Sequence, residues 1–200
     1  MKKSEYVYRE MLYQRLDKKQ YQFTQLALAK KLGISLSTVN NSLAPLEAMG
    51  AITKTPMGFK LIDPKKLLIF WASKRNLQKD IAYQTRIEAP ITEIEKNMPS
   101  KIAYAAYTAY KFKFNDVPAD YGEIYVYATE KTLREIKTRF PQKNGPSNLI
   151  VLKADVNMEQ CIEKDTCSIA NIFVDMWNIG TWYAKEFLQA LEKKVDRVLA

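Results

Sequence analysis

Two short helical patterns separated by Gly33 constrain the fold of this chain more than any other feature. Leu28 and Leu32 precede the glycine at the four-residue spacing of a buried helical stripe, and Val39 and Leu43 follow it at the same spacing. Gly33 can adopt the left-handed conformation that ends a helix, and the isoleucine after it can fill the angle between two helices. The segment therefore predicts a helix-turn-helix.

The flanking segments extend this pattern. An amphipathic helix is expected over residues 4–16, and after Gly50 the period changes from 3.6 to 2. Residues 51–55 and 59–62 then read as short strands joined by a tight turn at Pro56-Met57-Gly58. The expected N-caps of the three helices are Ser4, Thr24 and Ser35. Helix, helix, helix and hairpin is the order of a winged helix-turn-helix.

Positive charge is concentrated in this part of the chain. The 200 residues include 31 Lys+Arg and 22 Asp+Glu, a net charge of +9. Residues 1–70 hold 12 basic and 5 acidic side chains, whereas residues 71–200 hold 19 and 17. The N-terminal third is therefore the part suited to a polyanion such as double-stranded DNA.

Short hydrogen-bonding side chains occupy the third helix. Asn can pair with both polar atoms of the adenine edge, and Ser and Thr can contact bases or phosphates. No Lys or Arg lies between Lys31 and Lys54, so base readout would lack the strong contact from Arg to guanine. The candidate DNA-binding residues are Ser35, Ser37, Thr38, Asn40, Asn41 and Ser42 on the helix and Lys54 and Lys60 on the wing.

Residues 23–52 resemble winged-helix transcriptional regulators of bacteria and archaea. The resemblance lies in Phe23-Thr24-Gln25-Leu26-Ala27, in Leu32 through Leu43, and in Leu46-Glu47-Ala48-Met49-Gly50-Ala51-Ile52. It implies that the third helix lies in the major groove and that the wing contacts the DNA backbone.

The rest of the chain is expected to form a second, mixed domain. Asp63-Pro64 starts a linker helix, which gives expected domains of 1–72 and 73–200. The fold class is therefore α/β (α+β), an N-terminal winged helix-turn-helix followed by a mixed α/β domain. The expected elements of the second domain are strands at 81–86, 122–128 and 148–152, a helix at 100–113, a helix capped by Thr129, and a helical end.

Several side chains in the second domain could suggest a ligand site, but each has a simpler interpretation. Tyr104, Tyr107 and Tyr110 follow a helical spacing and are predicted to lie in a core or an interface, rather than to stack on bases. Carboxylates at 116, 120 and 123 surround a Pro-containing loop and are predicted to form a solvated turn rather than a metal site. Cys161 and Cys167 could be structural thiols, a disulfide or half of a zinc site.

The composition argues against most catalytic chemistry. The chain has no histidine, no Gly-rich phosphate loop, no Gly-Ser dipeptide and no Asp-x-Asp pair. We therefore expect no catalytic residues, no cofactor and no metal, and a protein that is not an enzyme. No stretch approaches 18 apolar residues and the first residues are charged, which predicts a cytoplasmic protein with no membrane partner.

Residues 169–191 resemble the C-terminal end of the AbiEi family, the antitoxin and regulator half of type IV toxin-antitoxin systems. The residues alone predict two amphipathic helices hinged at Gly180, with Trp177, Trp182, Phe187, Leu188 and Leu191 packed inward. The resemblance implies a repressor of its own operon, an antitoxin, with a cognate nucleotidyltransferase-like toxin as partner. Two-fold operators would favour a homodimer.

Two other functions fit the same sequence. The winged helix could bind another protein instead of DNA, which would make the chain a protein-interaction module. The tyrosine-rich second domain could instead bind a small effector that shifts the affinity for DNA, which would make it a ligand-sensing regulator.

Overall fold

The structure is a computed structural model, and it describes residues 1–199. The chain divides into two compact units. The first comprises Met1–Arg75 and the described residues from Val195 on, and the second comprises Asn76–Lys194. The mixed helix and strand content of both units confirms the predicted α/β class.

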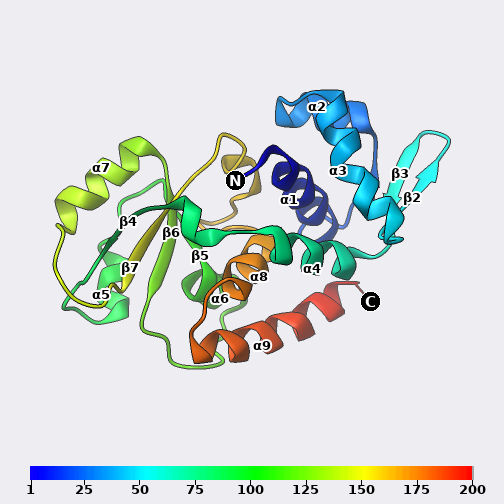
Figure 1. Ribbon diagram of the computed structural model, residues 1–200. Coiled ribbons are helices and arrows are strands. Elements are labelled where there is room, and N and C mark those ends of the chain that lie inside the picture. Colours follow the sequence, from blue (N-terminus) through cyan, green and yellow to red (C-terminus); the bar gives the residue numbers. More distant parts are fainter. Residues whose placement is uncertain (200) are drawn as a thin grey trace. The chain divides into compact units, whose positions relative to one another are not determined.

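The first unit contains four helices and a small antiparallel sheet, apart from its share of the last helix. Its elements in chain order are α1 (Lys3–Leu16), β1 (Gln22–Phe23), α2 (Gln25–Leu32), α3 (Leu36–Ala48), β2 (Ile52–Thr55), β3 (Gly58–Leu61) and α4 (Pro64–Lys74). The sheet has the order β1-β3-β2, and β2 and β3 form the hairpin that extends beyond α3 (Figure 1). We call this hairpin, residues 52–61, the wing.

Local sequence signals start and end the helices of the helix-turn-helix. The hydroxyl oxygens of Thr24 and Ser35 accept hydrogen bonds from the backbone N–H of Ala27 and Thr38, as expected of N-caps. Gly33 has φ +63° at the end of α2, which confirms the predicted left-handed residue. The prediction for Ser4 is wrong, because α1 already begins at Lys3 and has no side-chain cap.

The core of the first unit lies between α1, α3 and α4. Val7 and Met11 of α1, Val39 and Leu46 of α3 and Trp71 of α4 are all fully buried. Their spacing along each helix follows the apolar stripes of the sequence. This packing holds α3 by one face and leaves its other face exposed.

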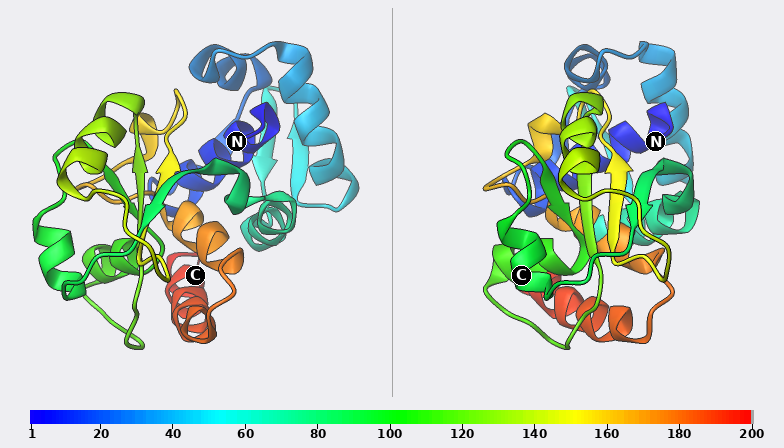
Figure 2. Two further views of the ribbon diagram at one scale, coloured as in Figure 1. Left: turned by 60° about the vertical axis from the view of Figure 1, so that its left-hand side comes forward. Right: turned by 90° about the vertical axis from the view of Figure 1, so that its left-hand side faces the viewer.

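The second unit is built on a four-stranded mixed sheet with the order β4-β7-β6-β5, whose strands run side by side in both views of Figure 2. Strands β6 and β7 are parallel, β4 is antiparallel to β7, and β5 is antiparallel to β6. The elements are η1 (Leu77–Asp80), β4 (Ile81–Thr85), α5 (Ile91–Lys96), β5 (Ala103–Ala105), α6 (Ala106–Phe114), β6 (Ile124–Ala128), α7 (Glu130–Arg139), β7 (Leu149–Lys153), η2 (Glu159–Cys161), α8 (Ile169–Trp177) and α9 (Trp182–Leu199).

Three elements differ from the prediction. The expected helix at 100–113 is a strand, β5, followed by the helix α6, because Ala103–Ala105 pairs with β6 and this long-range pairing overrides the local helical pattern. Residues 22–23 form strand β1 by pairing with β3, and no strand was expected before the hairpin. Helix α5 was not expected.

The two tryptophans near Gly180 are exposed, so the prediction that they pack inward is wrong. Trp177 is 46% exposed and Trp182 is 75% exposed. The buried stripe of α9 starts at Ala184 and continues through Phe187 and Leu191, and Trp182 lies two residues before it, off the stripe.

The tyrosines of α6 are core residues, as predicted. Tyr107 and Tyr110 are fully buried, and the Tyr107 ring contacts the rings of Tyr121 and Phe187. Burial raises the pKa of Tyr107 above its ordinary value of 10. This part of the second unit is a packed aromatic core.

Asp116 and the two cysteines were also singled out in the sequence, and the structure shows what surrounds each of them. Asp116 accepts a hydrogen bond from the hydroxyl of Tyr110 at 2.9 Å, and this bond together with Lys194 lowers the pKa of its carboxyl. Cys161 and Cys167 are buried thiols.

Within residues 1–199, no three potential ligand side chains gather as a metal ion would require. No helix in the same residues has the length and apolar character needed to cross a bilayer.

Candidate nucleic-acid interface

One face of α3 is exposed and polar. Ser37, Asn40, Asn41, Ala44 and Glu47 are exposed and recur every three or four residues, so they lie on the same side of the helix. The opposite side carries the buried residues that anchor α3 to the core. We call these five exposed residues the α3 face.

Ser42 lies on the buried side of α3, unlike the other candidates on this helix. It is only 3% exposed, and its hydroxyl donates to the carbonyl oxygen of Thr38 at 2.7 Å. The reason is helical phase, because Ser42 follows the buried Val39 by three residues. Its hydroxyl is therefore already bonded inside the first unit and does not contribute to the α3 face.

Ser35 and Thr38 form a small hydroxyl pair where α3 begins. Their side-chain oxygens are 2.8 Å apart, and the Ser35 oxygen also accepts the backbone N–H of Thr38 at 3.1 Å. One of the two hydroxyl hydrogens is used within the pair and the other remains available. The pair therefore both caps the helix and offers one donor at its N-terminal end.

The side chain of Asn40 is held by a residue of α2. The amide nitrogen Nε2 of Gln25 donates to Oδ1 of Asn40 at 3.3 Å. This contact leaves Nδ2 of Asn40 as a donor and the second lone pair of Oδ1 as an acceptor. Gln25 was not predicted as a site residue, although its position directly after the Thr24 cap places it at the exposed start of α2.

The two lysines predicted on the wing point to opposite faces of the hairpin. In the register of β2 and β3, Lys54 pairs with Phe59 and Lys60 pairs with Thr53. Paired residues in an antiparallel ladder point to the same side, and neighbours along a strand point to opposite sides. Lys54 thus shares the face of the buried Phe59, toward α3, whereas Lys60 lies on the outer face, 5.9 Å above the ring of Tyr21.

Lys54 closes one end of a groove between α3 and the wing. Its Nζ is 2.8 Å from Oε1 of Glu47, and both side chains remain substantially exposed. Gln25, Asn40 and Ala44 line the same groove. Glu47 was also missed in the sequence, although its spacing of seven residues from Asn40 places it on the same side of the helix.

Three other lysines of the first unit lie beside carboxylates. Lys31 is 2.6 Å from Oε1 of the buried Glu10. Lys65 pairs with Asp196, and Lys66 lies 3.7 Å from Asp63, the residue that caps α4. The neighbouring carboxylates therefore partly neutralise these three lysines.

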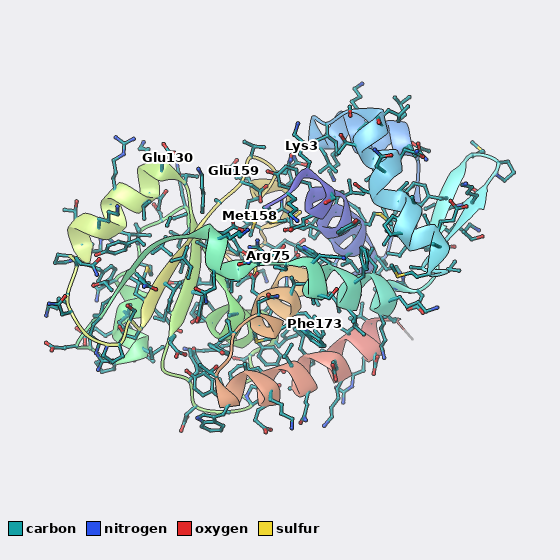
Figure 3. All side chains as sticks on the ribbon, in the orientation of Figure 1. Lys3, Arg75, Glu130, Met158, Glu159 and Phe173 are labelled. Carbon is teal, nitrogen blue, oxygen red and sulfur yellow. The ribbon has the colours of Figure 1, made fainter. Side chains whose placement is uncertain are left out.

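The second unit has a cavity of about 430 Å³ at the carboxyl ends of the parallel strands β6 and β7. Thr129 and Glu130 line it where α7 begins, and Met158 and Glu159 line it after β7. Figure 3 labels Glu130, Met158 and Glu159 around this end of the sheet. Ligands of open α/β sheets commonly bind outside the carboxyl ends of strands.

Comparison with known proteins agrees with the geometry of the first unit. Residues 22–53 match a family model described as winged helix-turn-helix DNA-binding, and the matched segment runs from β1 through α2 and α3 into β2. No curated protein and no solved structure matches the chain. The chain therefore contains a winged helix-turn-helix region of the DNA-binding type, which supports a DNA-binding regulator.

Proposed function

We propose that this chain is a sequence-specific transcriptional regulator that binds double-stranded DNA through α3 and the wing and represses its own operon. The observation that carries the proposal is the α3 face, a row of exposed hydrogen-bonding side chains beside a wing, inside the region that matches the DNA-binding family model. Such a face fits the major groove, where base edges present donors and acceptors. The proposed protein acts by occupying DNA, and no catalytic step is assigned to it.

An antitoxin role is the finer form of this proposal. It rests on the resemblance of residues 169–191 to the AbiEi family, which implies a nucleotidyltransferase-like toxin as a partner. A homodimer would match a two-fold operator, because each copy would present one α3 to one half-site. A regulator of this kind would act in the cytoplasm, where the operon lies.

A ligand-sensing regulator is a second candidate, favoured by the cavity at the carboxyl ends of β6 and β7. In that case a small effector would bind the second unit and change the affinity of the first unit for DNA. The discriminating observation is a change in DNA affinity when the effector is added.

Fluorescence anisotropy of the full chain on its own upstream DNA and on a scrambled duplex, across a range of salt concentrations, tests the proposal. We expect binding to the upstream DNA to be tighter by roughly a thousandfold or more, with affinity falling steeply as salt rises. Equal and weak binding to both duplexes would contradict the proposal. In that case, retention of a defined protein partner would favour the interaction module.

A further inference from the structure

We propose that the α3 face reads A·T base pairs, and that Gln25 is the residue that positions Asn40 for this contact. The inference rests on the proposed DNA-binding function and adds the class of base pair that the site recognises. Three observations carry it: the chemistry of the exposed side chains, the hydrogen bond between Gln25 and Asn40, and the ion pair at the end of the groove.

The α3 face offers groups that match A·T pairs better than G·C pairs. Each Asn carboxamide has one donor and one acceptor side by side, as do N6–H and N7 of adenine. The exposed methyl of Ala44 is suited to the 5-methyl group of thymine. Helix α3 carries no Arg or Lys, the side chains that bind O6 and N7 of guanine.

The hydrogen bond from Gln25 fixes which end of the Asn40 carboxamide faces which partner. With Oδ1 held by Gln25, Nδ2 is the free donor for N7 of adenine, and the remaining lone pair of Oδ1 can accept from N6–H. A side chain held before binding loses less conformational entropy when it binds. Asn41 has no such support, since no partner for its carboxamide occurs within residues 1–199.

The ion pair between Glu47 and Lys54 occupies the one acidic group of the α3 face. A carboxylate in the major groove accepts from N4 of cytosine, which would make Glu47 a reader of G·C pairs. In the structure this carboxylate is already bound by the ammonium of Lys54. The groups that remain available on the α3 face are the two carboxamides, the hydroxyl of Ser37 and the methyl of Ala44.

Base substitution in a selected duplex tests the reading of A·T pairs. Sites are first enriched from a pool of random duplexes with the full chain, and the enriched duplex is then resynthesised with one altered base at a time. We expect 7-deazaadenine, which lacks N7, to weaken binding roughly five- to fiftyfold at one or two positions. Uracil in place of the neighbouring thymine removes one methyl group and should lower the affinity about three- to fourfold.

7-Deazaguanine is the matched control, because it makes the same change in a G·C pair. We expect it to alter the affinity by less than about twofold. A large loss with 7-deazaguanine and none with 7-deazaadenine would overturn this inference and leave the proposed function intact. A pool that shows no enrichment would overturn the proposed function itself, and the reading of A·T pairs with it.

The variant Gln25→Ala tests the positioning role. We expect it to weaken binding to the enriched duplex about three- to tenfold, to leave scrambled DNA unaffected and to leave the unfolding temperature unchanged. On the 7-deazaadenine duplex the same variant should lower the affinity little further, because the contact that Gln25 supports is already lost. Gln22→Ala, at an exposed glutamine on β1, is the control that should not change the affinity for either duplex. Equal losses for Gln25→Ala on the normal and the altered duplex would overturn the positioning role.

Discussion

Glu47 of α3 and Lys54 of β2 form an ion pair across the groove of the candidate DNA interface, with Oε1 and Nζ 2.8 Å apart. In the proposed complex, the pair places a negative charge close to the DNA and occupies an ammonium group that could bind a phosphate. Both side chains are largely exposed, so the pair itself stabilises the fold by little. Its main effect is therefore on what the groove can bind.

Replacing Glu47 with Gln should strengthen binding to all DNA sequences. The change removes a carboxylate that repels phosphate and releases Lys54, so we expect a gain of about two- to fivefold at low salt. The slope of affinity against salt should steepen by up to about 0.9, the value for one additional phosphate contact. Anisotropy titrations across salt measure both quantities.

The control for this variant is Glu192→Gln, which makes the same change in net charge at an exposed residue of α9 in the second unit. If both variants strengthen binding equally, the gain comes from net charge and not from the ion pair at the groove.

The opposite orientation of the two wing lysines gives a second prediction. Lys54→Ala should weaken binding to specific and scrambled DNA alike, because it leaves the Glu47 carboxylate unpaired on the α3 side of the wing. In the Glu47→Gln background, where the ammonium is released, Lys54→Ala should also reduce the salt slope by up to about 0.9. Lys60→Ala should change both quantities less, because Lys60 lies on the outer face over Tyr21. The same anisotropy titrations compare the two variants, and an equal effect would place both faces of the wing against DNA.

The wing also shows why part of the site was not predictable from sequence. A three-residue turn at 56–58 would pair Lys54 with Lys60 and put both on one face. In the structure Thr55 pairs with Gly58, so the turn has two residues and the lysines separate. The sequence contains a good turn signal but does not determine the length of the turn.

Local signals, in contrast, determined the helix-turn-helix. The Thr24 and Ser35 caps and the left-handed Gly33 need only neighbouring residues, and all three were predicted. Strands β1 and β5 depend on partners far along the chain, and neither was predicted. The helical phase that buries Ser42 was available in the sequence, because Val39 already marked the buried side.

Gly58 gives a prediction on stability. A Cβ at this position would lie 2.2 Å from the backbone oxygen of Phe23, and the residue has φ +148°. Gly58→Ala therefore has to separate β3 from the segment that contains β1, and we expect a loss of about 2–4 kcal/mol in the free energy of unfolding together with loss of DNA binding. Denaturant titration followed by circular dichroism measures the first quantity.

Gly33→Ala is the matched control for the glycine variant. Gly33 also has a positive φ, of +63°, but nothing lies within 4 Å of its added Cβ. We expect Gly33→Ala to lower the free energy of unfolding by only about 1 kcal/mol, the cost of alanine in a left-handed conformation. Equal losses for the two glycines would show that the backbone angle, and not the contact with Phe23, determines the effect.

Two tyrosines of the second unit, one buried and one half-buried, indicate how the stability of the protein should change in alkali. Burial, with a smaller contribution from the Glu95 carboxylate, raises the pKa of Tyr104 to about 12, and burial together with the Glu123 carboxylate raises the pKa of Tyr183 to about 12. A tyrosine in the unfolded chain has a pKa near 10. Because the folded pKa is the higher one, folding favours the protonated form, and this contribution to stability is complete below pH 10 and is lost as the pH rises to about 12.

Denaturant midpoints measured between pH 8 and pH 12 should therefore fall most steeply above pH 10, where the absorbance of tyrosinate at about 295 nm rises. Tyr104→Phe removes one of these titrating groups and also the hydrogen bond from its hydroxyl to the backbone oxygen of Glu95. We expect this variant to be less stable at pH 8 by about 1 kcal/mol and to lose stability less steeply above pH 10. An alkaline slope equal to that of the unaltered protein would show that Tyr104 does not contribute to the transition.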